Sequence, residues 1–89
     1  MKDKITNTNL QIEGMGRVPV RIVIPNYNPN AHIDDAQYDE RYIELPNGHR
    51  IDAYGKNGYP VSERYQKELA RRYIMDNPDS ATSTATSRL

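Results

Sequence analysis

Few side chains in this sequence are suited to catalysis or metal binding, and those few are widely spaced. His32 is followed by Asp34 and Asp35, and His49 comes directly after the segment ELPNG. A zinc ion needs three or four well-placed ligands, and a calcium or magnesium ion needs several converging oxygens. The four residues match neither pattern. We therefore expect no bound metal and no cofactor.

His49 lies at the edge of a predicted turn and has two interpretations. As a catalytic or metal-binding residue it would need partners, and only His32, Asp34 and Asp35 are candidates. As a structural residue it would be half-exposed, with its ring over Leu45 and its polar edge in water. We adopt the structural interpretation, because no second reactive residue accompanies His49 at a spacing that such chemistry requires.

Catalysis by a nucleophile or by paired carboxylates has no support in the sequence. There is no cysteine, and no Gly-x-Ser-x-Gly elbow surrounds a serine. Acid pairs such as Asp39 and Glu40 would need a pocket to act as an acid and a base, and 89 residues leave little material for one. The segment GKNG, residues 55–58, precedes a predicted helix but lacks the spacing of a phosphate-binding loop. We expect a protein that is not an enzyme and has no catalytic residue.

Tyrosine and arginine are the residues that favour binding to another protein. The chain has seven Tyr but no Phe and no Trp, and both Tyr and Arg are enriched at protein interfaces. Our first hypothesis is a small binding protein, an adaptor, regulator or inhibitor that docks onto a protein partner. In size and in lack of cysteine and catalytic motifs it is similar in kind to accessory proteins of phages and mobile elements. The residues that we expect to bind the partner are Arg21, Tyr42, Arg50 and Tyr54.

Basic side chains along one predicted helix give the second hypothesis, a module that binds nucleic acid. Such residues contact phosphates, but acidic residues lie between them. The formal net charge is zero, from 12 basic and 12 acidic side chains, which removes the usual argument for a nucleic-acid-binding domain. A homodimer that covers the open face of the sheet is a further arrangement that suits this composition. The basic residues are Arg64, Lys67, Arg71 and Arg72.

Two predicted hairpins must position these residues. Val18, Val20, Ile22 and Ile24 alternate with polar residues, so they predict a strand that pairs with residues 10–12 around the turn at 14–16. Pro19 has no N–H for a ladder, so this is an edge strand, or the position of the missing N–H points outward.

The second hairpin surrounds the loop Pro46-Asn47-Gly48. A three-residue loop pairs Leu45 with His49, Glu44 with Arg50 and Ile43 with Ile51. Apolar residues then share one face, while Glu44 and Arg50 form a cross-strand ion pair on the other face.

One helix is predicted to start after Ser62 and to end near residues 76–78. Ser62 is a suitable N-cap, Glu63 complements the helix dipole, and favourable ion pairs four residues apart follow. An apolar stripe would lie on the sheet. Its members are Val61, Tyr65, Leu69 and Tyr73, with Ala70 and Ile74 beside them.

The predicted fold class is α+β, a small antiparallel sheet of three to four strands in two hairpins with one C-terminal helix packed on one face. Residues 1–8 are expected to be a flexible N-terminus, residues 9–76 a single domain, and residues 77–89 a disordered Ser/Thr-rich tail. The chain shows no secretory signal and no apolar stretch of membrane-spanning length. We therefore expect a cytoplasmic protein that does not enter a membrane.

Overall fold

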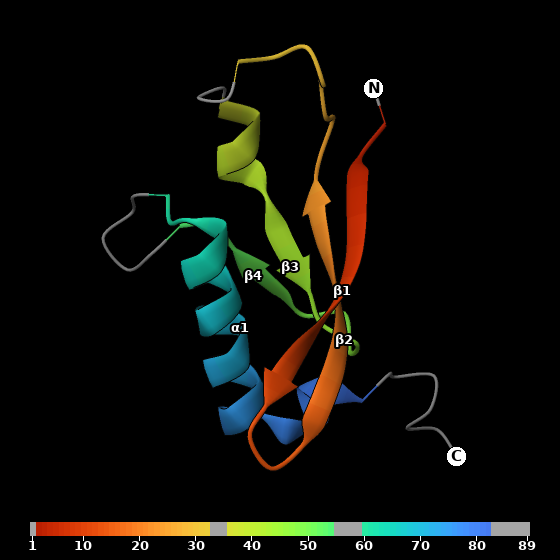
Figure 1. Ribbon diagram of the computed structural model, residues 1–89, viewed down its shortest axis with the longest axis vertical. Helices are drawn as coiled ribbons and strands as arrows, with labels where there is room; N and C mark the ends of the chain where they lie inside the picture. Colours follow the sequence, from red (N-terminus) through yellow and green to blue (C-terminus); the bar gives the residue numbers. More distant parts are fainter. Residues whose placement is uncertain (1, 33–35, 55–59, 83–89) are drawn as a thin grey trace.

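The computed structural model describes residues 2–32, 36–54 and 60–82, and it confirms the predicted α+β class. Four strands form one antiparallel sheet in the order β1-β2-β3-β4, and helix α1 packs against one side of it (Figure 1). No helix in these ranges is both long and apolar enough to cross a bilayer. The elements are β1 (Lys4–Ile12), β2 (Gly16–Ile24), the 3-10 helix η1 (Ala36–Glu40), β3 (Tyr42–Glu44), β4 (Arg50–Asp52), α1 (Glu63–Asp76) and the 3-10 helix η2 (Pro78–Ala81).

Strand β1 begins earlier in the chain than the sequence suggests. We expected residues 1–8 to fray, and this is wrong for residues 4–8, which pair with β2 from Lys4 opposite Ile24 onward. The preceding residues are also held, because Asp3 Oδ1 accepts a hydrogen bond of 3.0 Å from the Asn26 amide. Polar side chains on both faces of this stretch hide the period of two, although its backbone pairs as well as that of any strand.

Strand β2 is an inner strand, so the edge-strand alternative for Pro19 is wrong. It lies between β1 and β3, but β3 pairs only with residues 21–23 of β2. Leu45 N donates to His49 O on the β4 side (2.8 Å), and backbone amides alternate in direction along a strand, so the amide of Glu44 points toward β2. Arg21 is the β2 residue paired with Glu44, so the amide of Arg21 points toward β3. Pro19, two residues earlier, therefore directs its missing N–H to the same side, beyond the end of β3.

The hairpin of β3 and β4 confirms the predicted three-residue loop. Ile43 lies opposite Ile51, and Glu44 lies opposite Arg50. Gly48 N donates to Leu45 O (2.9 Å), and Gly48 has a φ of +92°, a conformation that glycine adopts at no steric cost. This loop fixes which side chains of both strands face the helix.

The core lies between the inner face of the sheet and α1. Apolar residues that alternate along the strands meet the helix at the buried Ala70 and Ile74 and at the partly buried Tyr73. The inner face of β1 and β2 contributes as predicted, as does that of β3. The buried members of this cluster are Leu10, Ile12, Val18, Val20, Ile22, Ile43, Leu45, Ala70 and Ile74.

Helix α1 begins as predicted, and its predicted residues Ala70, Ile74 and Tyr73 reach the core, but the first turn faces the sheet with a different residue. Ser62 Oγ accepts a hydrogen bond from Tyr65 N (3.2 Å), which confirms the N-cap. The helix buries Gln66, Ala70 and Ile74, whereas Tyr65, which we placed in the core, is 45% exposed. The two candidate stripes have the same spacing of four residues, and the polar Gln66 made its own stripe look like the weaker one.

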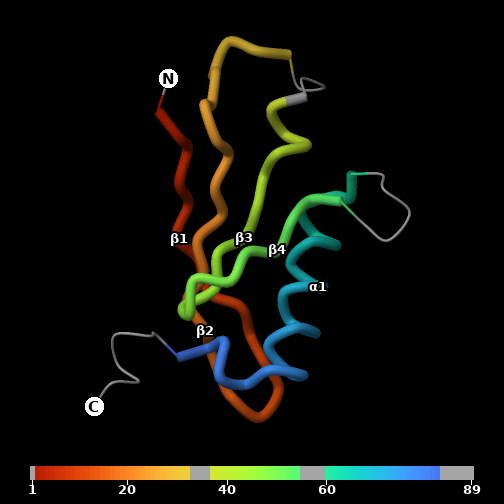
Figure 2. The backbone as a smooth tube through the Cα atoms, turned by 180° about the vertical axis from the view of Figure 1, so that it is seen from behind, coloured from red at the N-terminus to blue at the C-terminus, as the bar shows by residue number. Residues whose placement is uncertain are grey.

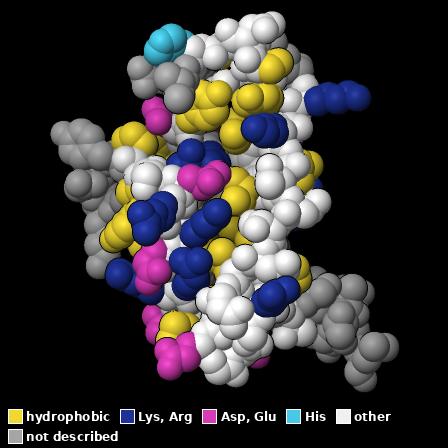
Figure 3. All heavy atoms as spheres, viewed as in Figure 1, with side chains coloured by type: hydrophobic (Ala, Val, Ile, Leu, Met, Phe, Trp, Pro, Cys, Tyr) yellow, Lys and Arg dark blue, Asp and Glu magenta, His cyan; other side chains and the backbone are white. Residues whose placement is uncertain are grey.

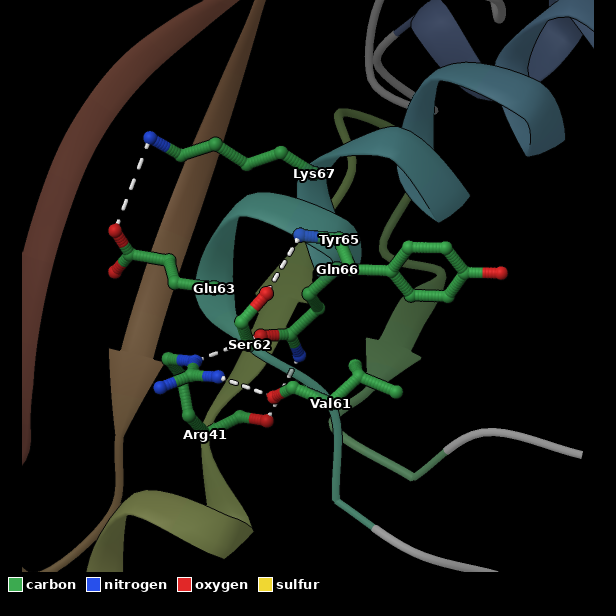
Figure 4. A network of polar contacts seen from close by, with 7 residues as sticks. All are labelled: Arg41, Val61, Ser62, Glu63, Tyr65, Gln66 and Lys67. Atoms are coloured by element: carbon green, nitrogen blue, oxygen red, sulfur yellow. Dashed lines mark hydrogen bonds and ion pairs between the residues drawn. The ribbon is translucent and has the colours of Figure 1, made fainter. Parts of the chain in front are cut away.

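Gln66 is tolerated in the core because its amide makes three hydrogen bonds, two of which are with Arg41 (Figure 4). Its Nε2 donates to Arg41 O and to Ile51 O, both at 2.9 Å, and its Oε1 accepts from Arg41 Nε at 2.7 Å. Arg41 Nη2 in turn donates to Val61 O at 3.0 Å. One side chain thus ties α1 to the start of β3, to β4 and, through Arg41, to the residue before the N-cap.

The segment after α1 is also ordered in part, which corrects the predicted tail. Residues 78–81 form η2, in which Ser80 is 1% exposed and Ala81 packs against the core cluster. Asn47 N donates to Ser80 O (3.3 Å), so η2 lies beside the loop between β3 and β4 (Figure 2). Residues 83–89 lie outside the described residues.

Replacing Gln66 by leucine should destabilise the fold. The variant keeps similar volume but removes the partners of Arg41 Nε, Arg41 O and Ile51 O, and unsatisfied buried polar groups cost about 1–3 kcal/mol each. Chemical denaturation should show a loss of roughly 2–4 kcal/mol. Lys67→Ala, at the next residue of the helix, is the control, since its 3.8 Å ion pair with Glu63 contributes about 0.5 kcal/mol or less. A Gln66→Leu protein as stable as the wild type would contradict this role.

Ending the chain at Asn77 should lower the melting temperature. It removes the buried Ser80, the packing of Ala81 and the hydrogen bond to Asn47 N, together about 1–2 kcal/mol. For a domain of this size each kcal/mol corresponds to roughly 4–8 °C. A chain that ends at Thr82 keeps all of η2 and is the matched control. Equal melting temperatures for the two truncated chains would show that η2 does not stabilise the domain.

Candidate protein-binding face

The sheet has an outer face, the side opposite α1, and the predicted partner-binding residues meet there. Pairing in the sheet sets Arg21 opposite Glu44, Glu44 opposite Arg50, and Tyr42 next to them on β3, all on this face. Tyr54 follows β4 at the same alternation, pairs with Pro60 in an isolated bridge and is 50% exposed. The structure therefore brings three of the four residues into one cluster and places Tyr54 at its margin.

Two contacts order this cluster before any partner arrives. Arg21 Nη1 lies 2.9 Å from Glu44 Oε1, and the guanidinium carbon of Arg50 lies 4.3 Å from the centroid of the Tyr42 ring. Glu44 lies opposite Arg50 as predicted, but it also lies opposite Arg21, and its ion pair is with Arg21. Arg50 instead makes a cation–π contact, worth about 0.5–1 kcal/mol at an exposed site.

A groove of about 480 Å³ opens beside the cluster. It lies where β3 leaves β2, at the position of Pro19, so its walls come from the first hairpin on one side and from the β3–β4 loop on the other. Its lining combines amide, apolar and charged groups. Residues that form it include Asn7, Asn9, Pro19, Arg21, Glu44 and Pro46.

The sequence did not point to the β1 side of this face. Asn7 and Asn9 line the groove, and Ile5 is 46% exposed next to them. We missed Ile5 and Asn7 because we expected residues 1–8 to fray. The available signal was the β-branched Ile5, Thr6 and Thr8, a composition that favours a strand.

The basic residues of the alternative site lie along α1, and most of them are paired with acids. Lys67 lies 3.8 Å from Glu63, and both Arg71 (3.4 Å) and Arg72 (3.5 Å) contact Glu68. Figure 3 shows acidic side chains interspersed with the basic ones on this side of the molecule. These ion pairs reduce the field that would attract a phosphate backbone.

His49 lies at the end of the β3–β4 loop, and its ring has a partner on the helix that the sequence did not indicate. It stacks on Tyr73 of α1, with centroids 4.0 Å apart and planes inclined by 3°. Among residues 2–32, 36–54 and 60–82, no three acidic or histidine side chains gather to hold a metal ion. Asp34, Asp35 and the segment 55–58 lie outside the described residues.

No family model, no curated protein and no solved structure matches this chain. Function is therefore inferred from the chemistry and geometry of the described surface, because a fold alone does not fix a function.

The stack of His49 on Tyr73 should stabilise the contact between the β3–β4 loop and α1. His49→Ala is expected to lower the free energy of unfolding by about 0.5–1.5 kcal/mol, the range for aromatic pairs. His49→Phe keeps a planar ring and should retain most of that stability. Denaturant titrations of both variants measure the difference, and equal losses in the two variants would rule out a role for the stacked ring.

Proposed function

We propose that this protein acts as a small adaptor, regulator or inhibitor that binds a protein partner through the outer face of its sheet. The observation that carries the proposal is the contact of the exposed Arg50 with the half-buried Tyr42 on a face that α1 leaves open. Tyr and Arg are the residue types that most often dominate binding energy at protein interfaces. A side chain ordered before binding loses less conformational entropy when the partner arrives.

Charge on this face favours a protein over a polyanion. Arg21 and Arg50 are accompanied by Glu44 and Asp52, so the central cluster has no net charge. Nucleic-acid binding depends on an excess of basic groups that release counterions from phosphates. A protein surface with a carboxylate for Arg50 and apolar groups for Tyr42 and Ile5 suits the cluster better.

The adjoining groove supports the same proposal, because it supplies concave surface next to the ordered side chains. Energetically important interface residues usually lie beside well-packed pockets from which water is excluded. A partner side chain inserted between the first hairpin and the β3–β4 loop would contact Pro19 and Pro46 while its backbone meets Asn7 and Asn9. Binding of nucleic acid through Arg64, Lys67, Arg71 and Arg72 remains the alternative proposal.

Capture from a native lysate, with and without nuclease, should separate the two proposals. We expect the tagged protein to retain one stoichiometric protein that resists nuclease. Tyr42→Ala or Arg50→Ala should weaken that complex by about 30-fold or more, the effect of removing a residue worth about 2 kcal/mol. Material that disappears with nuclease would support the alternative proposal instead.

Arg72→Ala is the matched control, because this side chain is 62% exposed and lies on α1, away from the outer face. It should leave binding of the protein partner unchanged, whereas it should weaken binding of nucleic acid. Circular dichroism should show that all three variants remain folded. A partner retained equally by Tyr42→Ala, Arg50→Ala and the wild type would exclude the outer face as the binding site.

A further inference from the structure

The exposed strand edges of this sheet are protected to very different degrees. Strand β4, at one end of the sheet, spans three residues and contacts α1. The side of β2 that β3 leaves open carries Pro19, which has no N–H to offer. Short edge strands and proline are two of the means by which proteins prevent edges from pairing with other chains.

Strand β1 has no comparable protection. It forms the other end of the sheet, spans nine residues, and pairs on one side only within the described part of the chain. It contains no proline, and its only charged residue is Lys4 at its first position. Leu10 and Ile12 near its end belong to the core cluster with Ala70 and Ile74 of α1, so the helix lies beside this end of β1 and the part of the edge farthest from α1 is residues 4–9.

Sheet pairing determines which backbone groups of β1 are free. The amide of Arg21 points toward β3, so by alternation the amide of the next residue, Ile22, points toward β1. There Ile22 exchanges backbone hydrogen bonds with its partner Thr6. By alternation the residues on either side of Thr6 direct their N–H and C=O groups to the open side. Ile5, Asn7 and Asn9 therefore offer a regular row of donors and acceptors.

We propose that β1 pairs with β1 of a second copy of this chain, antiparallel, about a two-fold axis through Asn7. This proposal concerns the sheet edge and does not depend on the proposed function of the outer face. In this register Asn7 lies opposite Asn7 of the second copy, and Ile5 lies opposite Asn9 of the second copy. All three residues are ones whose amides point outward, so each pair exchanges two backbone hydrogen bonds.

Self-complementarity is what favours a second copy over another peptide. The paired length is residues 5–9, which carry no charge, and Thr6 lies opposite Thr8. Lys4 lies just beyond this length, at the level of Leu10 of the second copy, so no like charges meet across the axis. The protein has no formal net charge, so two copies do not repel each other over long distances. A single strand pair buries less surface than the roughly 1,200–2,000 Å² of a permanent complex, so the dimer should dissociate on dilution.

Charged substitutions at the axis test both the dimer and its register. Sedimentation of the purified wild type from micromolar to millimolar protein should show a monomer–dimer equilibrium. Asn7→Lys and Asn7→Asp each place like charges opposite each other and should each weaken the dimer about tenfold or more. An equimolar mixture of the two variants should recover the dimer, because the charges across the axis then attract.

Met15→Lys is the control, since it adds the same charge at the exposed turn between β1 and β2 and should dimerise as the wild type does. Asn7 is exposed, so thermal melting should find each variant folded. A wild type that stays monomeric at all concentrations, or an Asn7→Lys protein that dimerises normally, would overturn the proposal. Loss of the dimer in both single variants without recovery in the mixture would overturn the register centred on Asn7.

Discussion

The buried amide of Gln66 is the interaction on which the arrangement of helix and sheet depends. A polar group in the core is costly unless all of its hydrogen bonds are made, and those of Gln66 go to Arg41 and to the Ile51 carbonyl of β4. Because these partners have fixed positions, the amide of Gln66 makes all of its hydrogen bonds at only one orientation of α1 about the helix axis. Apolar contacts of Ala70 and Ile74 would tolerate small rotations, but the amide does not. The polar contact therefore sets the orientation, while the apolar contacts supply most of the favourable energy.

Fixing α1 on one side of the sheet has a consequence for the other side. One helix of 14 residues covers the inner face, and the described residues contain no second α-helix that could cover the outer face. A chain of 89 residues has too little apolar material to bury both faces. The outer face is instead stabilised locally, by the Arg21–Glu44 ion pair and by Arg50 over Tyr42. The surface that we propose for binding thus results from the small size of the core.

The sequence predicted the elements in which local chemistry and the apolar pattern agree. The loop Pro46-Asn47-Gly48 and the alternation around Ile43 and Ile51 both require the same register, and this register is found. Prediction failed where a polar side chain occupies a position that only tertiary contacts justify. Gln66 occupies the buried stripe of α1, and Ser80 is buried at the start of a Ser/Thr-rich segment, where its carbonyl accepts a hydrogen bond from Asn47 N. Gln and Ser are residue types that usually lie on the surface, so the apolar periodicity of the sequence does not mark these two positions as buried.

The candidate site follows the same division. Arg21, Tyr42 and Arg50 share a face because strand alternation fixes it, and that much was predictable from the sequence. The sequence did not predict which arginine forms the ion pair with Glu44, because Arg21 and Arg50 both flank it and the choice depends on side-chain geometry. The contribution of β1 was missed because a strand polar on both faces has no period of two. Backbone pairing with β2, and not burial of its side chains, keeps residues 4–8 in the sheet.

The two proposed surfaces would be geometrically coupled if both exist. Antiparallel pairing of β1 about a two-fold axis keeps corresponding faces on the same side, so the outer faces of two copies would form one continuous surface. Each copy would present its own Tyr42 and Arg50 on that surface. A partner with two matching epitopes would then gain avidity without any new contact, because the second binding event becomes intramolecular. Thermodynamic linkage makes this effect reciprocal: the factor by which dimerisation raises the affinity for the partner equals the factor by which the bound partner raises the affinity of the two copies for each other. A weak edge pairing is therefore sufficient, since the partner itself would shift the equilibrium toward the paired state.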